Sequence, residues 1–67
     1  MNREKLNNVL DELNLSFRAF SRGIGIENTT NLYKKIRRGT LYERDIKKII
    51  DYLGLTAEEV MEIFFED

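Results

Sequence analysis

Side chains that can make specific hydrogen bonds gather between residues 28 and 38. Within this stretch Leu32 and Ile36 lie four residues apart, so they form one buried stripe if the segment is helical. The opposite face then presents hydroxyl, phenol, ammonium and guanidinium groups, from Thr29, Thr30, Tyr33, Lys34 and Arg37. Such groups suit the base edges and phosphates of a DNA major groove. We therefore expect a helix that reads DNA.

Basic side chains continue beyond that face. The C-terminal part of the expected helix holds four cations within five positions: Lys34, Lys35, Arg37 and Arg38. A helix dipole favours cations at this end, but four are more than that effect requires. Arg18 and Arg22 lie four apart on a preceding short helix, where we expect phosphate contacts, with two solvated arginines as the alternative. Arg44 lies near the start of a later helix, where a cation opposes the dipole, and this favours an anionic partner nearby.

The charge of the chain is uneven, although its net value is only −1. Residues 15 to 48 hold nine basic and three acidic side chains, whereas residues 49 to 67 hold six acidic and no basic ones. A domain of this kind can turn a basic face to phosphate while its acidic end points away. An acidic overall balance therefore does not exclude DNA, and a solvated charge distribution with no partner is the alternative.

Length and composition exclude several classes of function. The chain has 67 residues, no Cys and no His, so it forms one small domain, residues 1 to 67, with no disulfide, thiolate or histidine site. The acidic residues do not have the spacing of a calcium loop, and no nucleophile has a candidate base beside it. We expect no enzyme activity, catalytic residue, metal, cofactor or small-molecule substrate. No signal peptide or membrane-spanning run is apparent, so we expect a soluble, cytoplasmic protein.

Capping signals and apolar stripes predict five helices and no strand. Asn2 caps a first helix that ends near Asn14, and its buried stripe is Leu6, Val9, Leu10 and Leu13. Ser16 caps a short second helix, and Gly23 and Gly25 then supply the left-handed backbone of a tight turn. The third helix begins after a cap at residue 27 or 28, of which Asn28 is the better, and runs from about residue 29 to 37.

Two more helices complete the predicted domain. The fourth runs from about residue 43 to 53, with Gly54 as its C-terminal cap. In the fifth, Thr56 and Glu59 form a capping box. The apolar residues beyond it are more than one face can bury, and the candidates for a dimer or partner surface are Met61, Phe64 and Phe65. Folding back of the last two turns is an equal alternative to dimerisation.

Taken together, these pieces resemble the lambda-repressor-like (Cro/repressor, XRE-type) helix-turn-helix domains, especially small phage regulators. The best-matching segments are 15–16, 24–26, 30–36, 45–60 and 62–65, in the family's order and spacing. The resemblance implies a compact all-α domain of five helices, with the helix-turn-helix formed by the second and third. In that family the third helix enters the major groove and the second lies across the backbone.

The resemblance also implies roles for individual residues. It places six residues near bases or phosphates: Asn28, Thr29, Thr30, Tyr33, Lys34 and Arg37. It places Lys35 and Arg38 on the phosphate backbone. The chain departs from the family at Phe17, where many members have a phosphate-binding Gln, and at Ser21, where Ala is usual. The interval from the turn to Leu32 is also one residue longer.

Two functions follow as hypotheses. The first is a transcriptional regulator, a Cro-like or repressor-like phage or prophage protein, that binds a pseudo-palindromic operator in double-stranded DNA as a homodimer. The second is a protein-interaction module on the same scaffold, such as an antirepressor or an inhibitor of a host protein. The acidic C-terminal third, with its apolar residues, favours this second reading.

Overall fold

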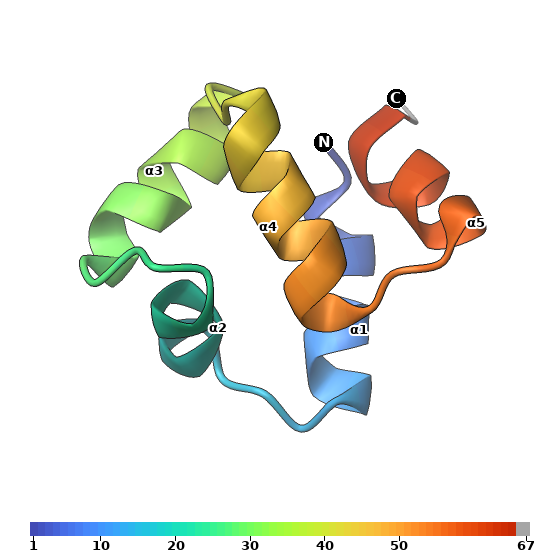
Figure 1. Cartoon of the computed structure of the whole chain (residues 1–67), viewed down its shortest axis with the longest axis horizontal. Coiled ribbons are helices and arrows are strands. Elements are labelled where there is room, and N and C mark those ends of the chain that lie inside the picture. The colour runs from blue at the N-terminus through green and yellow to red at the C-terminus, as the bar shows by residue number, and fades with distance from the viewer. Residues whose placement is uncertain (66–67) are drawn as a thin grey trace.

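Four of the helices, α1, α2, α3 and α5, begin where a short polar side chain bonds a free backbone N–H group. The computed structural model describes residues 1–65, and these form helices with no strand among them. The bounds are α1 Arg3–Glu12, α2 Phe17–Gly23, α3 Thr29–Arg38, α4 Glu43–Leu53 and α5 Ala57–Val60, which continues directly into one turn of π-helix, η1, Met61–Phe65. The all-α prediction is confirmed, and Figure 1 shows α4 between α3 on one side and α5 on the other.

The predicted N-terminal caps are all present. The side-chain oxygens of Asn2, Ser16 and Asn28 each accept a hydrogen bond from the backbone N–H three residues on, at 3.0, 3.1 and 3.2 Å. Thr56 and Glu59 form the expected capping box, with bonds of 3.1 and 2.9 Å. Each of these bonds satisfies an N–H that has no partner within its helix.

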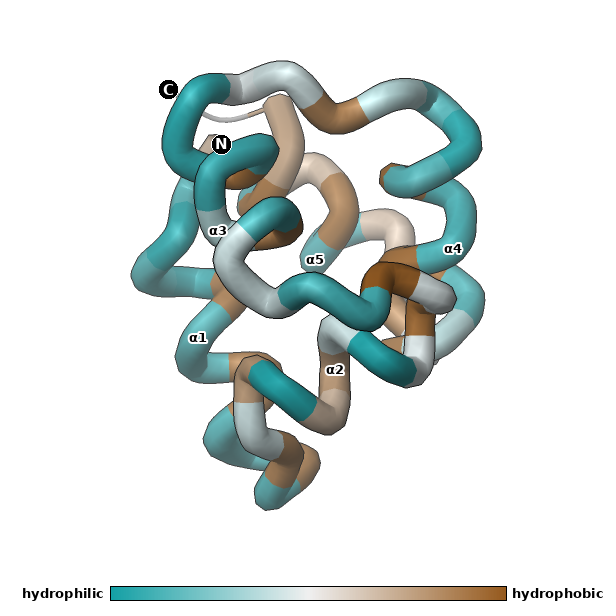
Figure 2. Tube along the Cα trace, turned by 90° about the vertical axis from the view of Figure 1, so that its left-hand side faces the viewer, coloured by the Kyte–Doolittle hydropathy of each residue, from teal (hydrophilic) through white to brown (hydrophobic). Residues whose placement is uncertain are grey.

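One hydrophobic core joins α1, α2, α3, α4 and η1. Ten apolar side chains are buried in it: Leu6, Val9, Leu10, Phe20, Ile24, Leu32, Ile36, Ile49, Leu53 and Ile63. Figure 2 shows hydrophilic and hydrophobic residues alternating along the helices, as amphipathic helices require. The core therefore fixes the rotation of each helix, and with it the set of side chains that α3 turns outward.

Two expectations about individual residues are wrong. Leu13 is 50% exposed rather than buried, because α1 ends at Glu12 and Leu13 is already its C-terminal cap. Gly23 lies within α2 and does not have the positive φ that Gly25 has. A Cβ on Gly23 would lie 2.1 Å from the ring of Tyr52 on α4, so a larger residue at this position would require that exposed ring to move.

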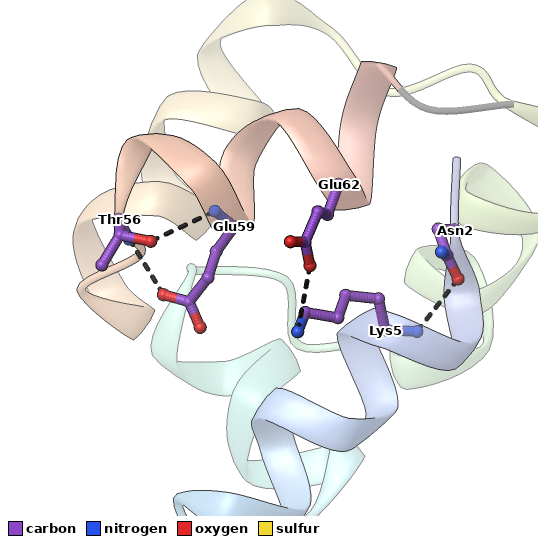
Figure 3. A network of polar contacts seen from close by, with 5 residues as sticks. All are labelled: Asn2, Lys5, Thr56, Glu59 and Glu62. Atoms are coloured by element: carbon purple, nitrogen blue, oxygen red, sulfur yellow. Dashed lines mark hydrogen bonds and ion pairs between the residues drawn. The ribbon is translucent and has the colours of Figure 1, made fainter.

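The start of α1 is bonded to the segment η1. The backbone N–H of Asn2 donates to the carbonyl of Ile63 at 2.7 Å, and Lys5 Nζ lies 3.0 Å from a carboxylate oxygen of Glu62. Figure 3 shows Lys5 and Glu62 pointing toward each other between α1 and the C-terminal segment. The C-terminal segment is thus held against α1 by polar contacts as well as by buried Ile63.

The Lys5–Glu62 ion pair makes the stability of the domain vary with pH in the alkaline range. The hydrogen bond and charge of Glu62 raise the pKa of Lys5 above its ordinary value of 10.5. The folded state therefore holds the Lys5 proton more tightly than the unfolded state does. The stability that the ion pair contributes is fully present below the pKa of Lys5 in the unfolded chain, and it is lost as pH rises through the pKa of Lys5 in the folded protein. We expect the stability difference between the parent and Glu62→Gln, from urea unfolding, to be constant at pH 7 to 9 and to shrink above about pH 10.5. A difference that persists unchanged to the highest pH would contradict this.

Candidate nucleic-acid interface

The turn between α2 and α3 is held by a fully buried hydroxyl. Ser21 has no exposed surface, and its Oγ donates a hydrogen bond to the carbonyl of Ile26. The N–H of Ile26 donates in return to the Ser21 carbonyl at 2.9 Å, while Gly25 takes the left-handed conformation with φ 83°. An alanine at position 21 would remove the Oγ donor. The direction in which α3 leaves the turn is therefore fixed by contacts within the turn itself.

The outward face of α3 carries most of the expected base-reading side chains. Leu32 and Ile36 are buried, as predicted, and the exposed side chains of the helix are Thr30, Asn31, Tyr33, Lys34, Arg37 and Arg38. Thr29 is half-buried. Asn28 is exposed, but its side-chain oxygen already caps the helix. The face thus keeps hydroxyl, phenol, ammonium and guanidinium groups free of the core.

A shallow depression joins α2 to the N-terminal end of α3. Arg18 and Arg22 line it from α2, and the residues that line it from the turn and α3 are Glu27, Asn28, Thr29 and Thr30. Both arginines are exposed. The structure therefore brings the two predicted phosphate contacts of α2 beside the first turn of α3. Glu27 is the one acidic side chain among these lining residues.

The other expected phosphate contacts are Lys35, Arg38 and Arg44, and two of them contact side chains at the start of α4. Lys35 Nζ is 3.9 Å from the Asp45 carboxylate and 5.6 Å from the centre of the Tyr42 ring. The Arg44 guanidinium lies 5.2 Å from the same ring. Cations over an aromatic face are held there by attraction to the ring. These contacts therefore orient Lys35, which is half-buried, and Arg44, which is exposed as Arg38 is.

Asp45 has a structural role that the sequence reading did not assign. Its side chain is buried, and one carboxylate oxygen accepts a hydrogen bond from the Tyr42 N–H at 3.2 Å. The acid stands at the third position of α4, where a carboxylate can reach back to the N-cap, so its position was the available signal. It fixes the start of α4 and, through Lys35, the C-terminal half of α3.

An aromatic contact between α2 and α3 was also not predicted. The rings of Phe17 and Tyr33 lie edge to face, with centroids 6.3 Å apart and planes at 79°. Phe17 makes a second such contact with buried Phe20, at 5.8 Å and 64°. Within residues 1–65, Tyr33 is thus the one expected base-reading residue whose side chain packs against an aromatic ring of α2.

The expected partner surface is exposed in part. Met61 and Phe65 are 59% and 66% exposed, and both lie on η1. Phe64 is half-buried and packs against the core, so less of it is available to a partner than of its two neighbours. The apolar surface at this end of the molecule therefore consists mainly of Met61 and Phe65.

Comparisons with protein-family models, curated proteins and solved structures found no significant match. Within residues 1–65 no helix has the length and apolar character needed to cross a bilayer. The same residues contain no group of three or more His, Cys, Asp or Glu side chains placed to hold a metal ion. A function must therefore be inferred from the residues and their geometry.

Proposed function

We propose that the chain binds double-stranded DNA in a sequence-specific manner and regulates transcription, with α3 in the major groove and α2 across the phosphate backbone. The observation that carries this proposal is the depression in which Arg18 and Arg22 of α2 flank the first turn of α3. The free N–H groups and dipole at a helix N-terminus also favour a phosphate. In the lambda-repressor-like domains that the sequence resembles, the third helix likewise enters the major groove.

The distribution of charge supports the same orientation. The basic side chains of residues 15 to 48 lie on α2, α3 and α4, whereas residues 49 to 65 carry four acidic side chains and no basic one. In Figure 1 the C-terminal helix lies across α4 from α3. A basic face can therefore approach phosphate while the acidic end stays on the far side, and counterion release supplies affinity for any sequence.

The side chains divide into two roles in this proposal. Base edges are read from the outward face of α3 by exposed Thr30, Tyr33, Lys34 and Arg37, with Asn28 and Thr29 at its N-terminal end. Phosphates are contacted by Arg18, Arg22, Lys35, Arg38 and Arg44. Two copies related by a two-fold axis would read half-sites about 34 Å apart. Exposed Met61 and Phe65 are the candidate contact between the copies.

The exposed apolar residues also support a second candidate function. Met61 and Phe65 project from the acidic end of the molecule, and exposed apolar surface on a small protein commonly marks a protein contact. In this alternative the same scaffold serves as an antirepressor or an inhibitor of a host protein, and it does not bind DNA.

Binding to a pool of random duplexes distinguishes the two functions. Fluorescence anisotropy at two salt concentrations is expected to show a steep loss of affinity with salt, because phosphate contacts release counterions. Sequencing of the bound fraction is expected to reveal an inverted repeat. Binding that is absent even at low salt would contradict the DNA proposal and favour the protein-partner function, for which Phe65 would be the first residue to replace.

A further inference from the structure

We propose that Phe17 is a positioning residue for Tyr33, and that it thereby sets the base preference of the DNA-reading face without touching DNA. This inference rests on the proposed function, because it assigns Tyr33 a place in the major groove. Phe17 has no hydrogen-bonding group with which to hold a phosphate or a base. Its effect on recognition must therefore act through the side chains that it contacts.

The position of Phe17 is itself well defined. Its ring lies edge to face with Phe20, at 5.8 Å, and Phe20 has no exposed surface. From this anchored position it meets the ring of Tyr33 at 6.3 Å and 79°. Edge-to-face pairs at such separations are favoured because the positive edge of one ring meets the negative face of the other. A chain of rings thus leads from the core to the outward face of α3.

Tyr33 needs this restraint because half of its surface is open. It is 49% exposed, and a groove runs beside it whose apolar lining is Leu6, Phe17, Tyr33 and Ile36. Polar side chains of α1, among them Arg3 and Asn7, also line the groove. If the Phe17 ring were removed, the groove would widen and the Tyr33 ring could turn into it, since burial of aromatic surface is favourable. An aromatic ring at position 17 keeps Tyr33 directed outward.

The expected consequence is a loss of discrimination rather than a general loss of binding. Base recognition depends on the orientation of the reading group, whereas phosphate contacts hold the protein on any sequence. Arg18 and Arg22 of α2 line the depression beside the first turn of α3, and Phe17 does not line this depression. Replacing Phe17 should therefore change the preference at one base pair and leave affinity for random DNA nearly unchanged.

The test combines replacements at positions 17 and 33. Using the sequence selected from the random pool, affinities are measured for all four base pairs at each position, for Phe17→Leu, Phe17→Tyr, Tyr33→Ala and the double variant Phe17→Leu/Tyr33→Ala. Tyr33→Ala is expected to lose about 5-fold or more of the preference at one base pair. Phe17→Leu should lose preference at that same base pair, Phe17→Tyr should retain it, and Phe17→Leu should add nothing in the Tyr33→Ala background, because coupled residues are not additive.

A measurement without DNA keeps the inference separate from the proposed function. In NMR spectra of the free protein, the side-chain couplings and ring shifts of Tyr33 should report one rotamer in the parent and in Phe17→Tyr, and an average in Phe17→Leu. Circular dichroism and urea unfolding confirm that each variant is folded. A parent that binds no DNA overturns the proposed function and the recognition role together. This inference alone is overturned if the parent binds DNA specifically and the folded Phe17→Leu variant keeps both the Tyr33 rotamer and the base preference of the parent.

Discussion

Replacing Leu32 with alanine is expected to lower the free energy of unfolding by about 2 to 5 kcal/mol. Leu32 has no exposed surface and lies in the single core, so the smaller side chain leaves a cavity that its neighbours fill only in part. A core in a chain of 67 residues rarely supplies more than about 3 to 5 kcal/mol of net stability. We therefore expect a largely unfolded protein at 25 °C, measured by circular dichroism and urea unfolding.

The matched control for Leu32 is its neighbour on the same helix. Asn31 is exposed and its side chain makes no hydrogen bond recorded within residues 1–65, so Asn31→Ala should change stability by about 0.5 kcal/mol or less. If Leu32→Ala lowered stability by no more than the control does, α3 would not be held by this buried stripe. The orientation of its outward face would then need another cause.

Replacing Arg37 with alanine is expected to weaken binding to the selected operator by about 1 to 3 kcal/mol, if this guanidinium reads a base. Arg37 is exposed on the outward face of α3, and no salt bridge to it is recorded within residues 1–65. Its side chain is therefore available for a bidentate contact, of the kind that arginine makes with guanine. The loss should be confined to one base pair of each half-site, measured as affinities for all four alternatives there.

Arg38 provides the control for charge in the same turn of α3. It is exposed and is proposed to contact a phosphate, so Arg38→Ala should weaken binding nearly equally for all sequences and lower the salt slope by about 1. Arg37→Ala and Arg38→Ala remove the same charge from adjacent positions. Equal losses for every sequence in both variants would mean that Arg37 is a phosphate contact and that the bases are read by other side chains.

The helices could be predicted from the sequence because their signals are local. Asn2, Ser16, Asn28 and Thr56 each bond an N–H three residues away, so the cap and its partner lie in one short window of the chain. Periodicity likewise identified Leu32 and Ile36 as buried. It failed at Leu13 because the apolar pattern continues past the point at which the helix ends.

The contacts that shape the candidate site could not be predicted in the same way. Phe17 meets Tyr33, Lys35 meets Asp45, and Gly23 meets Tyr52, and in each case the partners belong to different helices. Such pairs depend on how the helices pack against one another, and neither apolar periodicity nor capping residues in the sequence indicate that packing. Side-chain types therefore indicated the candidate DNA-binding residues, whereas the structure was needed to identify the residues that contact them.

The hydrogen bond between Asn2 and Ile63 makes the fold nearly circular. Since residues 2 and 63 are adjacent in space, a short peptide could join these two positions, and the chain could instead be opened in the loop at Gly39, where a Cβ would meet nothing within 4 Å. The rearranged protein would begin with α4 and end with α3. Helix α3 would then be a terminal element, joined to the rest of the domain by the turn after α2, by the core and by the contacts of Tyr33 with Phe17 and of Lys35 with Asp45.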